Sequence, residues 1–299
     1  MTGTPAMIDQ TFYQAYPAMD DRQFRQWQSL LEARTGIYLP PERQAFLQSK
    51  LASRMRELGE YNYQAYFDHV TRGDRGWQEW ATLVDRLTVR ETRFFRDPDA
   101  FAFIQQAFSD HSERHLEAWS LGCASGEEAY SLAITLAQLC RQNPSLTHFG
   151  VTGTDISSAA LSQAREGLYP GSRLSHVAPE LLSEHFLPQA DGRFQVSAAL
   201  RERVCFSRLN VLELEDAPMH GMDLVFCQNL LIYFRRWRRR QIVNMLVERL
   251  QPGGLLILGQ GDLTDWQHPL MERLPEQRVA AWRRRSPESV TGGVNGQPA

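Results

Sequence analysis

The chain has 299 residues, a formal net charge of −3 and 42% hydrophobic residues. This length predicts about two domains, and the apolar content excludes disorder over most of the chain. The balanced charge is not that of a typical nucleic-acid-binding protein, so we expect no nucleic-acid partner. Apolar runs stay well short of the roughly 18 residues that a membrane span requires, so we expect no direct membrane insertion.

The cysteines form no C-x-x-C pair and have no histidine cluster beside them, so we expect no metal site. They are Cys123, Cys140, Cys205 and Cys227. Residues 1–20 lack the basic start and apolar core of a signal peptide, and we therefore expect a cytoplasmic protein with free thiols. Of the 32 basic residues only Lys50 is a lysine. Because the arginines are spread along the whole chain, we interpret most of this skew as genomic bias.

The N-terminal part of the chain has a helical pattern. Residues 1–18 lack a clear period and are predicted to be a flexible arm. Over 19–87, apolar residues recur at steps of three and four and predict helices near 20–35, 42–58, 63–72 and 76–87. Gly36 and Gly59 suit the ends of the first two. On the second helix Arg43, Lys50 and Arg54 share a face apart from the apolar stripe. This part is predicted to be an all-α domain.

The pattern changes after the linker 88–98, in which Pro98 indicates an extended or turning chain. Strand candidates at 116–121, 149–156, 204–206, 222–227 and 255–258 alternate with helical patterns, which predicts a parallel sheet covered on both faces. We assign residues 99–285 to this α/β domain. Turn-forming residues and a strand-like run at 193–196 predict a small antiparallel β-subdomain inserted at 168–203. Residues 286–299 are rich in Gly, Pro, Ser and Asn and are predicted to be a disordered tail.

The strongest local signal is the loop between the first strand and its helix. It reads Gly122-Cys123-Ala124-Ser125-Gly126-Glu127-Glu128. Small residues let a ligand approach the backbone, and the helix N-terminus offers free N–H groups. Two carboxylates oppose a phosphate and suit a cationic ligand instead. The alternative is a tight turn with favourable acids in the first turn of the helix.

Two further segments end strands and carry polar side chains. Asp155 lies at the end of the second strand candidate, where an acid can accept both hydroxyls of a ribose; the alternative is a helix cap. Together with the small-residue loop it favours S-adenosylmethionine over a nicotinamide dinucleotide. Asn229 and Tyr233 follow the strand at 222–227, at the edge where ligands of open α/β sheets bind. The alternative for Tyr233 is a core aromatic.

These segments, in this order, resemble the CheR-type chemoreceptor glutamate methyltransferases. The resemblance covers roughly residues 20–265 and implies a Rossmann-like class I methyltransferase domain with a small β-subdomain, preceded by an all-α N-terminal bundle. The matching segments are Glu91-Thr92-Arg93-Phe94-Phe95-Arg96-Asp97, the loop 122–128, Gly153-Thr154-Asp155-Ile156, Arg208-Leu209-Asn210-Val211 and Phe226-Cys227-Gln228-Asn229-Leu230-Leu231-Ile232-Tyr233-Phe234.

The resemblance also implies a site. The expected cofactor contacts are Arg90, Thr92, Arg96, Gly122, Glu127, Asp155, Asn210, Val211, Gln228 and Asn229. Arg96 and Tyr233 are expected to face the methyl acceptor as catalytic residues. The chain departs from the family at two of these positions, since the family commonly has Asn where Arg90 stands and Arg where Gln228 stands.

The implied activity is methyl transfer from S-adenosylmethionine to receptor glutamates, which gives methyl esters and S-adenosylhomocysteine. The expected partner is the cytoplasmic domain of a chemoreceptor, and the protein is expected to be a monomer. Arg43, Lys50 and Arg54 are a candidate docking face for an acidic receptor helix; the alternative is a solvated helix face. Two other functions stay open: a methyltransferase of a small molecule or RNA, and a non-catalytic cofactor-binding receptor adaptor. The arginine-rich run 235–240 is interpreted as an exposed helix start rather than a nucleic-acid site.

Overall fold

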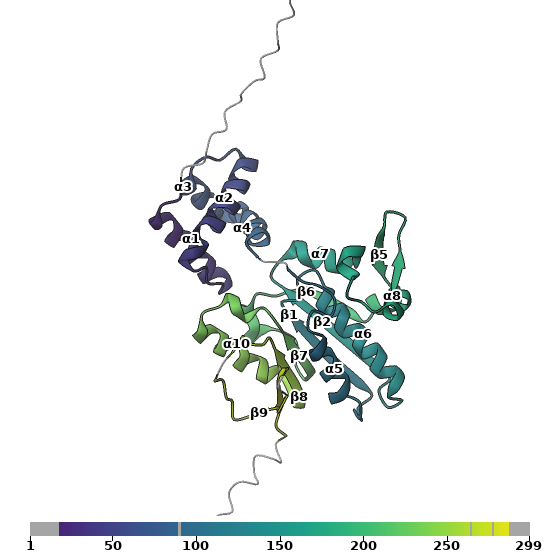
Figure 1. Ribbon diagram of the computed structural model, residues 1–299. Coiled ribbons are helices and arrows are strands. Elements are labelled where there is room, and N and C mark those ends of the chain that lie inside the picture. The colour runs from purple at the N-terminus through teal and green to yellow at the C-terminus, as the bar shows by residue number, and fades with distance from the viewer. Residues whose placement is uncertain (1–17, 89–90, 264, 277, 287–299) are drawn as a thin grey trace, which may run out of the picture.

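The computed structural model describes residues 18–88, 91–263, 265–276 and 278–286. The predicted arm and tail lie outside the described residues, apart from residues 18 and 286. A lobe of helices formed by the N-terminal part of the chain lies beside a larger lobe built around a sheet (Figure 1). The predicted α/β class with a preceding all-α part is confirmed.

The N-terminal lobe consists of helices that bury one apolar stripe each. Its elements are α1 (Asp21–Thr35), η1 (Pro41–Arg43), α2 (Gln44–Leu58), α3 (Tyr63–Thr71) and α4 (Gly73–Leu87). Asp20 caps α1 through a capping box, and Gly36 ends it in the left-handed conformation, with φ 75°. The four helices share one apolar core, which includes Trp27, Leu51 and Tyr66.

Helix α4 begins three residues earlier than the predicted start at Gly76. The sequence suggested that this glycine opens the helix, but it lies inside it. A Cβ on Gly76 would come within 2.9 Å of the carbonyl oxygens of His69 and Val70. The glycine is therefore needed for the close approach of α3 and α4.

The larger lobe contains a seven-stranded sheet in the order β6-β2-β1-β7-β8-β10-β9. The first five strands in this order are parallel, and β10 and β9 are antiparallel to their neighbours. The strands are β1 (His115–Leu121), β2 (His148–Asp155), β6 (Val204–Arg208), β7 (Met222–Cys227), β8 (Leu250–Leu258), β9 (Met271–Arg273) and β10 (Ala280–Arg284). The strands predicted from the sequence did not include β9 and β10.

Helices cover both faces of this sheet, as the hydrophobic strands predict. Successive residues of β1 point to opposite faces, so Ala118 belongs to one apolar core and Trp119 to the other. The elements around the sheet are α5 (Pro98–Ala107), α6 (Glu127–Gln142), α7 (Ser158–Glu166), α9 (Ala198–Arg201), η3 (Val211–Asp216), η4 (Leu231–Tyr233) and α10 (Arg236–Arg249). Figure 1 shows α5 and α6 on one side and α10 on the other.

The chain turns just before Pro98, as the sequence indicates, and Asp97 has a non-helical backbone with φ −121° and ψ 84°. Pro98 is the first residue of α5, and the Asp97 side chain caps this helix by accepting from the amide of Ala100 at 3.3 Å. Proline is tolerated at the first helical position because its missing N–H would have no partner there in any case. The capping aspartate before it was the signal for a helix start.

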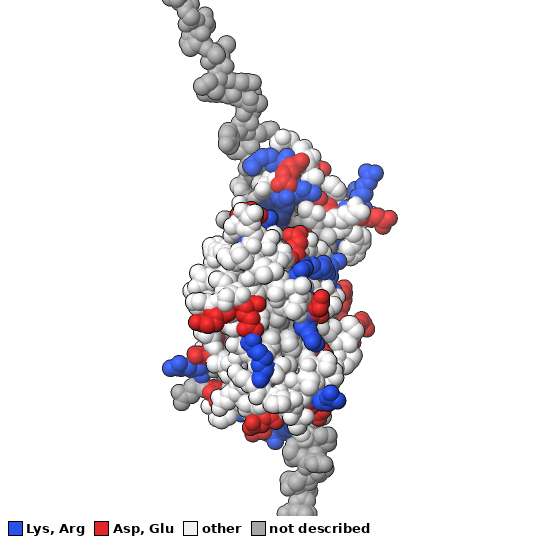
Figure 2. Space-filling view, turned by 90° about the vertical axis from the view of Figure 1, so that its right-hand side faces the viewer, with Lys and Arg blue, Asp and Glu red and all other residues white. Residues whose placement is uncertain are grey.

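The predicted insertion is a three-stranded antiparallel sheet in the order β3-β5-β4. Its elements are β3 (Leu168–Pro170), η2 (Gly171–Leu174), α8 (Pro179–His185), β4 (Phe186–Pro188) and β5 (Arg193–Val196). In Figure 1 it projects from the lobe beyond α7, on the side away from the N-terminal helices. Acidic and basic side chains are interspersed over the face in Figure 2, in keeping with the small net charge.

Candidate functional site

A cavity opens at the carboxyl ends of β1, β2 and β7, where ligands of open α/β sheets bind. Its empty volume, which includes open solvent, is about 710 Å³. Residues from four separate segments line it: Glu91, Thr92, Arg93, Arg96, Asp97, Phe101, Gly122, Ala124, Glu128, Asp155, Phe226, Gln228, Asn229, Leu230, Ile232 and Tyr233. The cavity thus brings together six of the ten predicted cofactor contacts and Tyr233. Glu127, Asn210 and Val211 are not among its lining residues.

Backbone strain is concentrated at this cavity. Among the described residues, four non-glycine residues have positive φ, and three of them belong to the cavity or its linker: Phe95 (50°), Ala124 (47°) and Asn229 (58°). Such conformations persist only where the surrounding structure imposes them, and they are concentrated at functional sites. The amide of Phe95 is held by the hydroxyl of Ser131 at 3.0 Å.

Asp155 ends β2 with both carboxylate oxygens engaged by backbone amides. Oδ2 accepts from Ala124 N at 2.9 Å and Oδ1 from Ser157 N at 2.8 Å. Burial raises the pKa of this carboxyl, and the amides of Ser157 and Ala124 oppose the shift. The helix that follows is capped by Ser157 and not by Asp155. Each oxygen retains a lone pair, so Asp155 can accept the hydroxyls of a ribose.

The two glutamates of the loop have different surroundings. Glu128 lines the cavity, and its Oε1 accepts from the Ser120 hydroxyl at 2.6 Å. Burial raises the pKa of Glu128 to about 8, against the opposing effect of Ser120. Glu127, the residue expected from the family resemblance, is fully buried and is not among the residues that line the cavity. One helical step rotates a side chain by about 100°, so neighbouring glutamates cannot share one direction.

The linker supplies a cation and a capped helix to the same cavity. Arg96 donates from Nη1 to the carbonyl oxygen of Glu91 at 2.7 Å, and its side chain is exposed. Gln228 is 6% exposed and donates from Nε2 to Asp97 Oδ2 at 2.8 Å. The linker is therefore tied to the segment after β7. Arg90 lies outside the described residues.

Tyr233 lines the cavity from η4. Burial raises the pKa of its hydroxyl, and the positive charges of Arg96 and Arg43 oppose the shift. The hydroxyl therefore stays protonated at neutral pH and can donate a hydrogen bond. The Tyr233 side chain is partly buried: it packs against the apolar core and also lines the cavity, so it is not a wholly buried core aromatic.

Asn210 and Val211 line a second cavity next to the first. The two cavities share Gly122, Asp155 and Leu230. Part of the Asn210 side chain is already engaged, since Nδ2 donates to the carbonyl oxygen of Arg34 at 2.7 Å. The second cavity also has Thr35 and Ile37 in its wall.

The N-terminal lobe therefore forms part of the site, which the sequence reading did not identify. Ile37 pairs with Phe234 in an antiparallel β-bridge, and the amide of Tyr38 donates to the carbonyl oxygen of Tyr233 at 2.8 Å. At another contact between the two lobes, the hydroxyl of Ser157, which caps α7, donates to Asp85 Oδ1 of α4 at 2.6 Å. The signal was absent because these partners lie far apart in the sequence.

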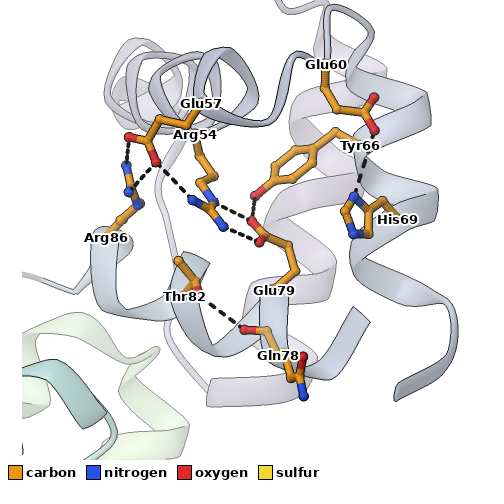
Figure 3. A network of polar contacts seen from close by, with 9 residues as sticks. All are labelled: Arg54, Glu57, Glu60, Tyr66, His69, Gln78, Glu79, Thr82 and Arg86. Atoms are coloured by element: carbon orange, nitrogen blue, oxygen red, sulfur yellow. Dashed lines mark hydrogen bonds and ion pairs between the residues drawn. The ribbon is translucent and has the colours of Figure 1, made fainter. Parts of the chain in front are cut away.

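The structure separates the three cations of the predicted docking face. Arg54 is bound inside the lobe: it donates to both oxygens of Glu79, at 2.8 and 2.6 Å, and to Glu57 at 2.9 Å (Figure 3). Its side chain is 19% exposed. Arg54 is therefore held within the lobe, because α4 brings Glu79 opposite it, and its part in docking stays a prediction.

Arg43 and Lys50 have a different environment. Both lie beside the ring of Phe46, at 5.9 and 5.6 Å from its centroid. Arg43 and Phe46 line a third, largely apolar cavity that also contains Ile232 and Tyr233. This third cavity is therefore adjacent to the first, with which it shares Ile232 and Tyr233.

The arginine-rich run lies at the start of α10, as interpreted from the sequence. Arg235 pairs with Glu32 of α1 at 2.6 Å and lies over the Tyr38 ring. Arg239 donates to the carbonyl oxygens of Phe234 and Ile232 at 2.8 and 3.2 Å. These contacts anchor the helix start to the site rim.

The part of the chain that the structure describes offers no cluster of metal ligands and no membrane-spanning helix. No group of three or more His, Cys, Asp or Glu side chains there could hold a metal ion. No helix of these residues is long and apolar enough to cross a membrane. All four cysteines are free, and Cys123 and Cys227 are buried.

Comparison with known proteins gives matches over most of the chain. The chemotaxis protein methyltransferases of Escherichia coli K12 and Salmonella typhimurium LT2 are 30% and 31% identical over 251 and 249 residues, and each alignment covers 82% of this chain and 85% of the relative. Chemotaxis protein methyltransferase 2 of Pseudomonas aeruginosa is 32% identical over 268 residues, 87% of this chain and 91% of the relative.

Two family models match consecutive parts of the chain. The model described as "CheR methyltransferase, all-alpha domain" matches residues 22–88, and "CheR methyltransferase, SAM binding domain" matches residues 90–280. The second model alone covers more than half of the chain. This protein therefore belongs to the CheR methyltransferase family, whose cofactor is S-adenosylmethionine.

Proposed function

We propose that the protein transfers a methyl group from S-adenosylmethionine to glutamate side chains in the cytoplasmic domain of a chemoreceptor. The products are glutamate γ-methyl esters and S-adenosylhomocysteine. The observation that carries the proposal is one cavity in which Arg96 and Tyr233 stand together with Glu128 and Asp155. The first two suit a carboxylate acceptor, and the last two suit a cationic nucleoside.

The residues of the two joined cavities fit the cofactor. Asp155 has free lone pairs for ribose hydroxyls, and Glu128 offers a carboxylate to a positively charged group. The second cavity has apolar walls, including Val211 and Phe234, which suit a planar base. When bound, S-adenosylmethionine supplies an activated methyl group on a positively charged sulfur.

The protein's own side chains have a limited chemical task. A glutamate acceptor has an ordinary pKa near 4.3 and is ionised at neutral pH, so no general base is needed. Arg96 can pair with this carboxylate through its planar guanidinium, and the protonated Tyr233 can donate to one oxygen. Alignment of two reactants in a site is worth about 7–11 kcal/mol. Orientation and exclusion of water are therefore the contributions we assign to these residues.

Arg43 and Lys50 are proposed to attract the acidic receptor helix. Arg43 lines the third, largely apolar cavity, and Lys50 lies beside Phe46 in its wall. An amphipathic helix could bury apolar residues in this cavity while its acidic residues face the two cations. Arg54 is left out because Glu79 and Glu57 already bind it.

The first experiment measures methylation of receptor-containing membranes with labelled S-adenosylmethionine. Arg96→Ala is expected to reduce kcat/KM about 100-fold through misalignment. Tyr233→Phe is expected to reduce it about tenfold, the value of one hydrogen bond to a charged group. Arg283→Ala, an exposed arginine on β10, is the control. Wild-type activity of both site variants would refute the assigned roles.

The same assay separates the other functions. Transfer of label to RNA or to a small molecule, with none to receptor, would replace the proposed substrate. Cofactor binding without transfer to any acceptor would support the adaptor.

A second experiment tests docking. Lys50→Glu is expected to raise the KM for receptor while the affinity for S-adenosylhomocysteine stays unchanged. Arg22→Glu makes the same charge change at an exposed position of α1 and serves as the control. Equal KM values for the two variants would contradict a docking role for Lys50.

A further inference from the structure

The inserted subdomain is packed directly against the linker that carries Arg96. Phe94 of the linker is fully buried between two aromatic residues of the insertion. Its ring centroid lies 5.0 Å from that of Tyr169 and 5.2 Å from that of Phe186, and both pairs are edge-to-face. Such pairs contribute beyond the area that they bury. The linker conformation thus depends on the insertion.

The same insertion contacts the loop 122–128. The hydroxyl of Tyr169 donates to the carbonyl oxygen of Ser125 at 2.6 Å. Gly126 has φ 95°, and a Cβ there would lie 2.9 Å from the Tyr169 hydroxyl and 2.8 Å from Ala164 Cβ. The Tyr169 side chain of the insertion therefore packs against the backbone of the loop, with no room for a side chain at position 126.

Arg173, on η2 of the insertion, joins the linker and the loop. Its Nη1 donates to the carbonyl oxygen of Thr92 at 2.5 Å and lies 3.7 Å from Glu127 Oε1. Thr92 lines the cavity and stands four residues before Arg96. One guanidinium nitrogen therefore faces both segments that build the cavity wall.

Glu127 is the buried partner in this arrangement. Its Oε2 accepts from the Ser125 hydroxyl at 2.7 Å, whereas Oε1 is buried and has no hydrogen-bond partner among the described residues. The charged or titratable groups around it are Arg173, the Tyr169 hydroxyl and the Cys123 thiol. Arg173 is the cation that offsets the charge of this fully buried carboxylate.

We propose that Arg173 is a positioning residue, through which the inserted subdomain holds the linker and the Glu127 end of the loop in the geometry that binds the cofactor. Arg173 touches neither cofactor nor acceptor in this proposal. The proposal rests on the cofactor cavity described above but not on the identity of the methyl acceptor. It gives the insertion a role in shaping the site.

The test is binding of S-adenosylhomocysteine, measured by calorimetry on the full chain, together with receptor methylation. Arg173→Gln is expected to weaken binding about tenfold and to reduce kcat, by analogy with the loss of outer supports in other sites. The KM for receptor is expected to stay unchanged. Arg173→Lys, which keeps one cationic donor group, is expected to recover part of the affinity. Arg193→Ala, an exposed arginine of the same subdomain, is the control.

A double-mutant cycle with Glu127→Gln tests the route. If Arg173 acts through Glu127, the double variant is expected to lose much less affinity than the sum of the two single losses. Strictly additive losses would refute that route, and wild-type binding and kcat in Arg173→Gln would overturn the proposal. A change in the receptor KM alone would also overturn it, because that result assigns Arg173 to docking.

Two controls distinguish failure of this proposal from a folding defect and from failure of the proposed function. Thermal unfolding of each variant identifies a loss of structure, and in that case the comparison between Arg173→Lys and wild type decides. If receptor methylation is absent even in wild type, the proposed function fails, while calorimetry still reports on Arg173.

Discussion

Glu79 in the N-terminal lobe and Glu127 beside the cofactor cavity are both buried carboxylates that face an arginine. Glu79 has every oxygen satisfied: Oε1 accepts from Arg54 at 2.8 Å and from the Tyr66 hydroxyl at 2.6 Å, and Oε2 accepts from Arg54 at 2.6 Å (Figure 3). Glu127 has one oxygen with no hydrogen-bond partner among the described residues, and Nη1 of its arginine, Arg173, lies 3.7 Å from that oxygen. We call the network around Glu79 closed, because each carboxylate oxygen accepts a hydrogen bond. We call the network around Glu127 open, because one oxygen accepts none from the described residues.

The pKa shifts of the two carboxyls follow this difference. Burial alone would raise the pKa of Glu79, but the hydrogen bonds from Arg54 and Tyr66 outweigh it and lower the pKa. For Glu127 burial dominates, and the pKa is raised despite Ser125 and Arg173. A closed network stabilises the fold, whereas an open network leaves a buried carboxylate whose desolvation cost is only partly offset.

The largest expected effect comes from breaking the closed network. Arg54→Ala leaves Glu79 buried with one donor, and removal of one partner of a buried pair costs on the order of 3 kcal/mol. We expect the urea unfolding midpoint to fall by that equivalent. The affinity of the folded variant for S-adenosylhomocysteine should stay at the wild-type value, because Arg54 lies outside the cavities. An unchanged midpoint would contradict the closed network.

The next effect compares the same substitution at both glutamates. Glu79→Gln removes charge-assisted hydrogen bonds worth about 1.5–3 kcal/mol and should lower the melting temperature. Glu127→Gln removes a charge that burial penalises and should leave the melting temperature at or above that of wild type. Calorimetric scans of both variants check this contrast, and equal destabilisation would remove it.

The two glutamates make the stability of the fold depend on pH with opposite signs. The pKa of Glu79 is lower in the folded state, so its stabilisation is present above about pH 4.3 and is lost as pH falls through the lowered value. The pKa of Glu127 is raised, so its ionisation destabilises the fold as pH rises above about 4.3. The advantage of Glu127→Gln over wild type should therefore grow with pH, and a constant difference would contradict the raised pKa.

Glu128 extends the contrast to ligand binding. Burial raises its pKa to about 8, so we expect the free protein to hold a proton there at pH 7. A cationic ligand favours the carboxylate, and we expect binding of S-adenosylmethionine to release close to one proton. The affinity should then rise about tenfold per pH unit below the pKa. Calorimetry in buffers of different ionisation enthalpy measures the release, which Glu128→Gln should abolish.

The smallest effect is expected at the exposed edge of the closed network. Arg86 donates to both oxygens of Glu57, which is exposed. Solvent screens such pairs, so Arg86→Ala should shift the urea midpoint much less than Arg54→Ala. Equal shifts would mean that burial does not separate the two pairs.

Local sequence was sufficient for the residues that follow strands. Asp155 ends β2, and Asn229 and Tyr233 follow β7; the topology of a parallel sheet brings such positions to one edge. The helix boundaries at Asp20 and Gly36 were also predictable, because their caps are local.

Residues whose partners are distant in the chain could not be placed from sequence. The cation face of α2 looked uniform until α4 brought Glu79, 25 residues away, opposite Arg54. Asn210 donates to a carbonyl 176 residues earlier, and no local pattern records that contact. Glu127 and Glu128 differ only through the orientation of α6, so sequence alone could not assign one of them to the cavity.

The bridge between Ile37 and Phe234 has a consequence for protein engineering. Because Ile37 belongs to the cavity wall and Tyr38 holds the backbone of Tyr233, the helices and the cofactor domain share one structural joint. A chimera that takes its helical lobe from a relative must therefore keep residues 35–39 matched to the segment 231–234. Exchange of the lobe without this joint is expected to alter the affinity for the cofactor.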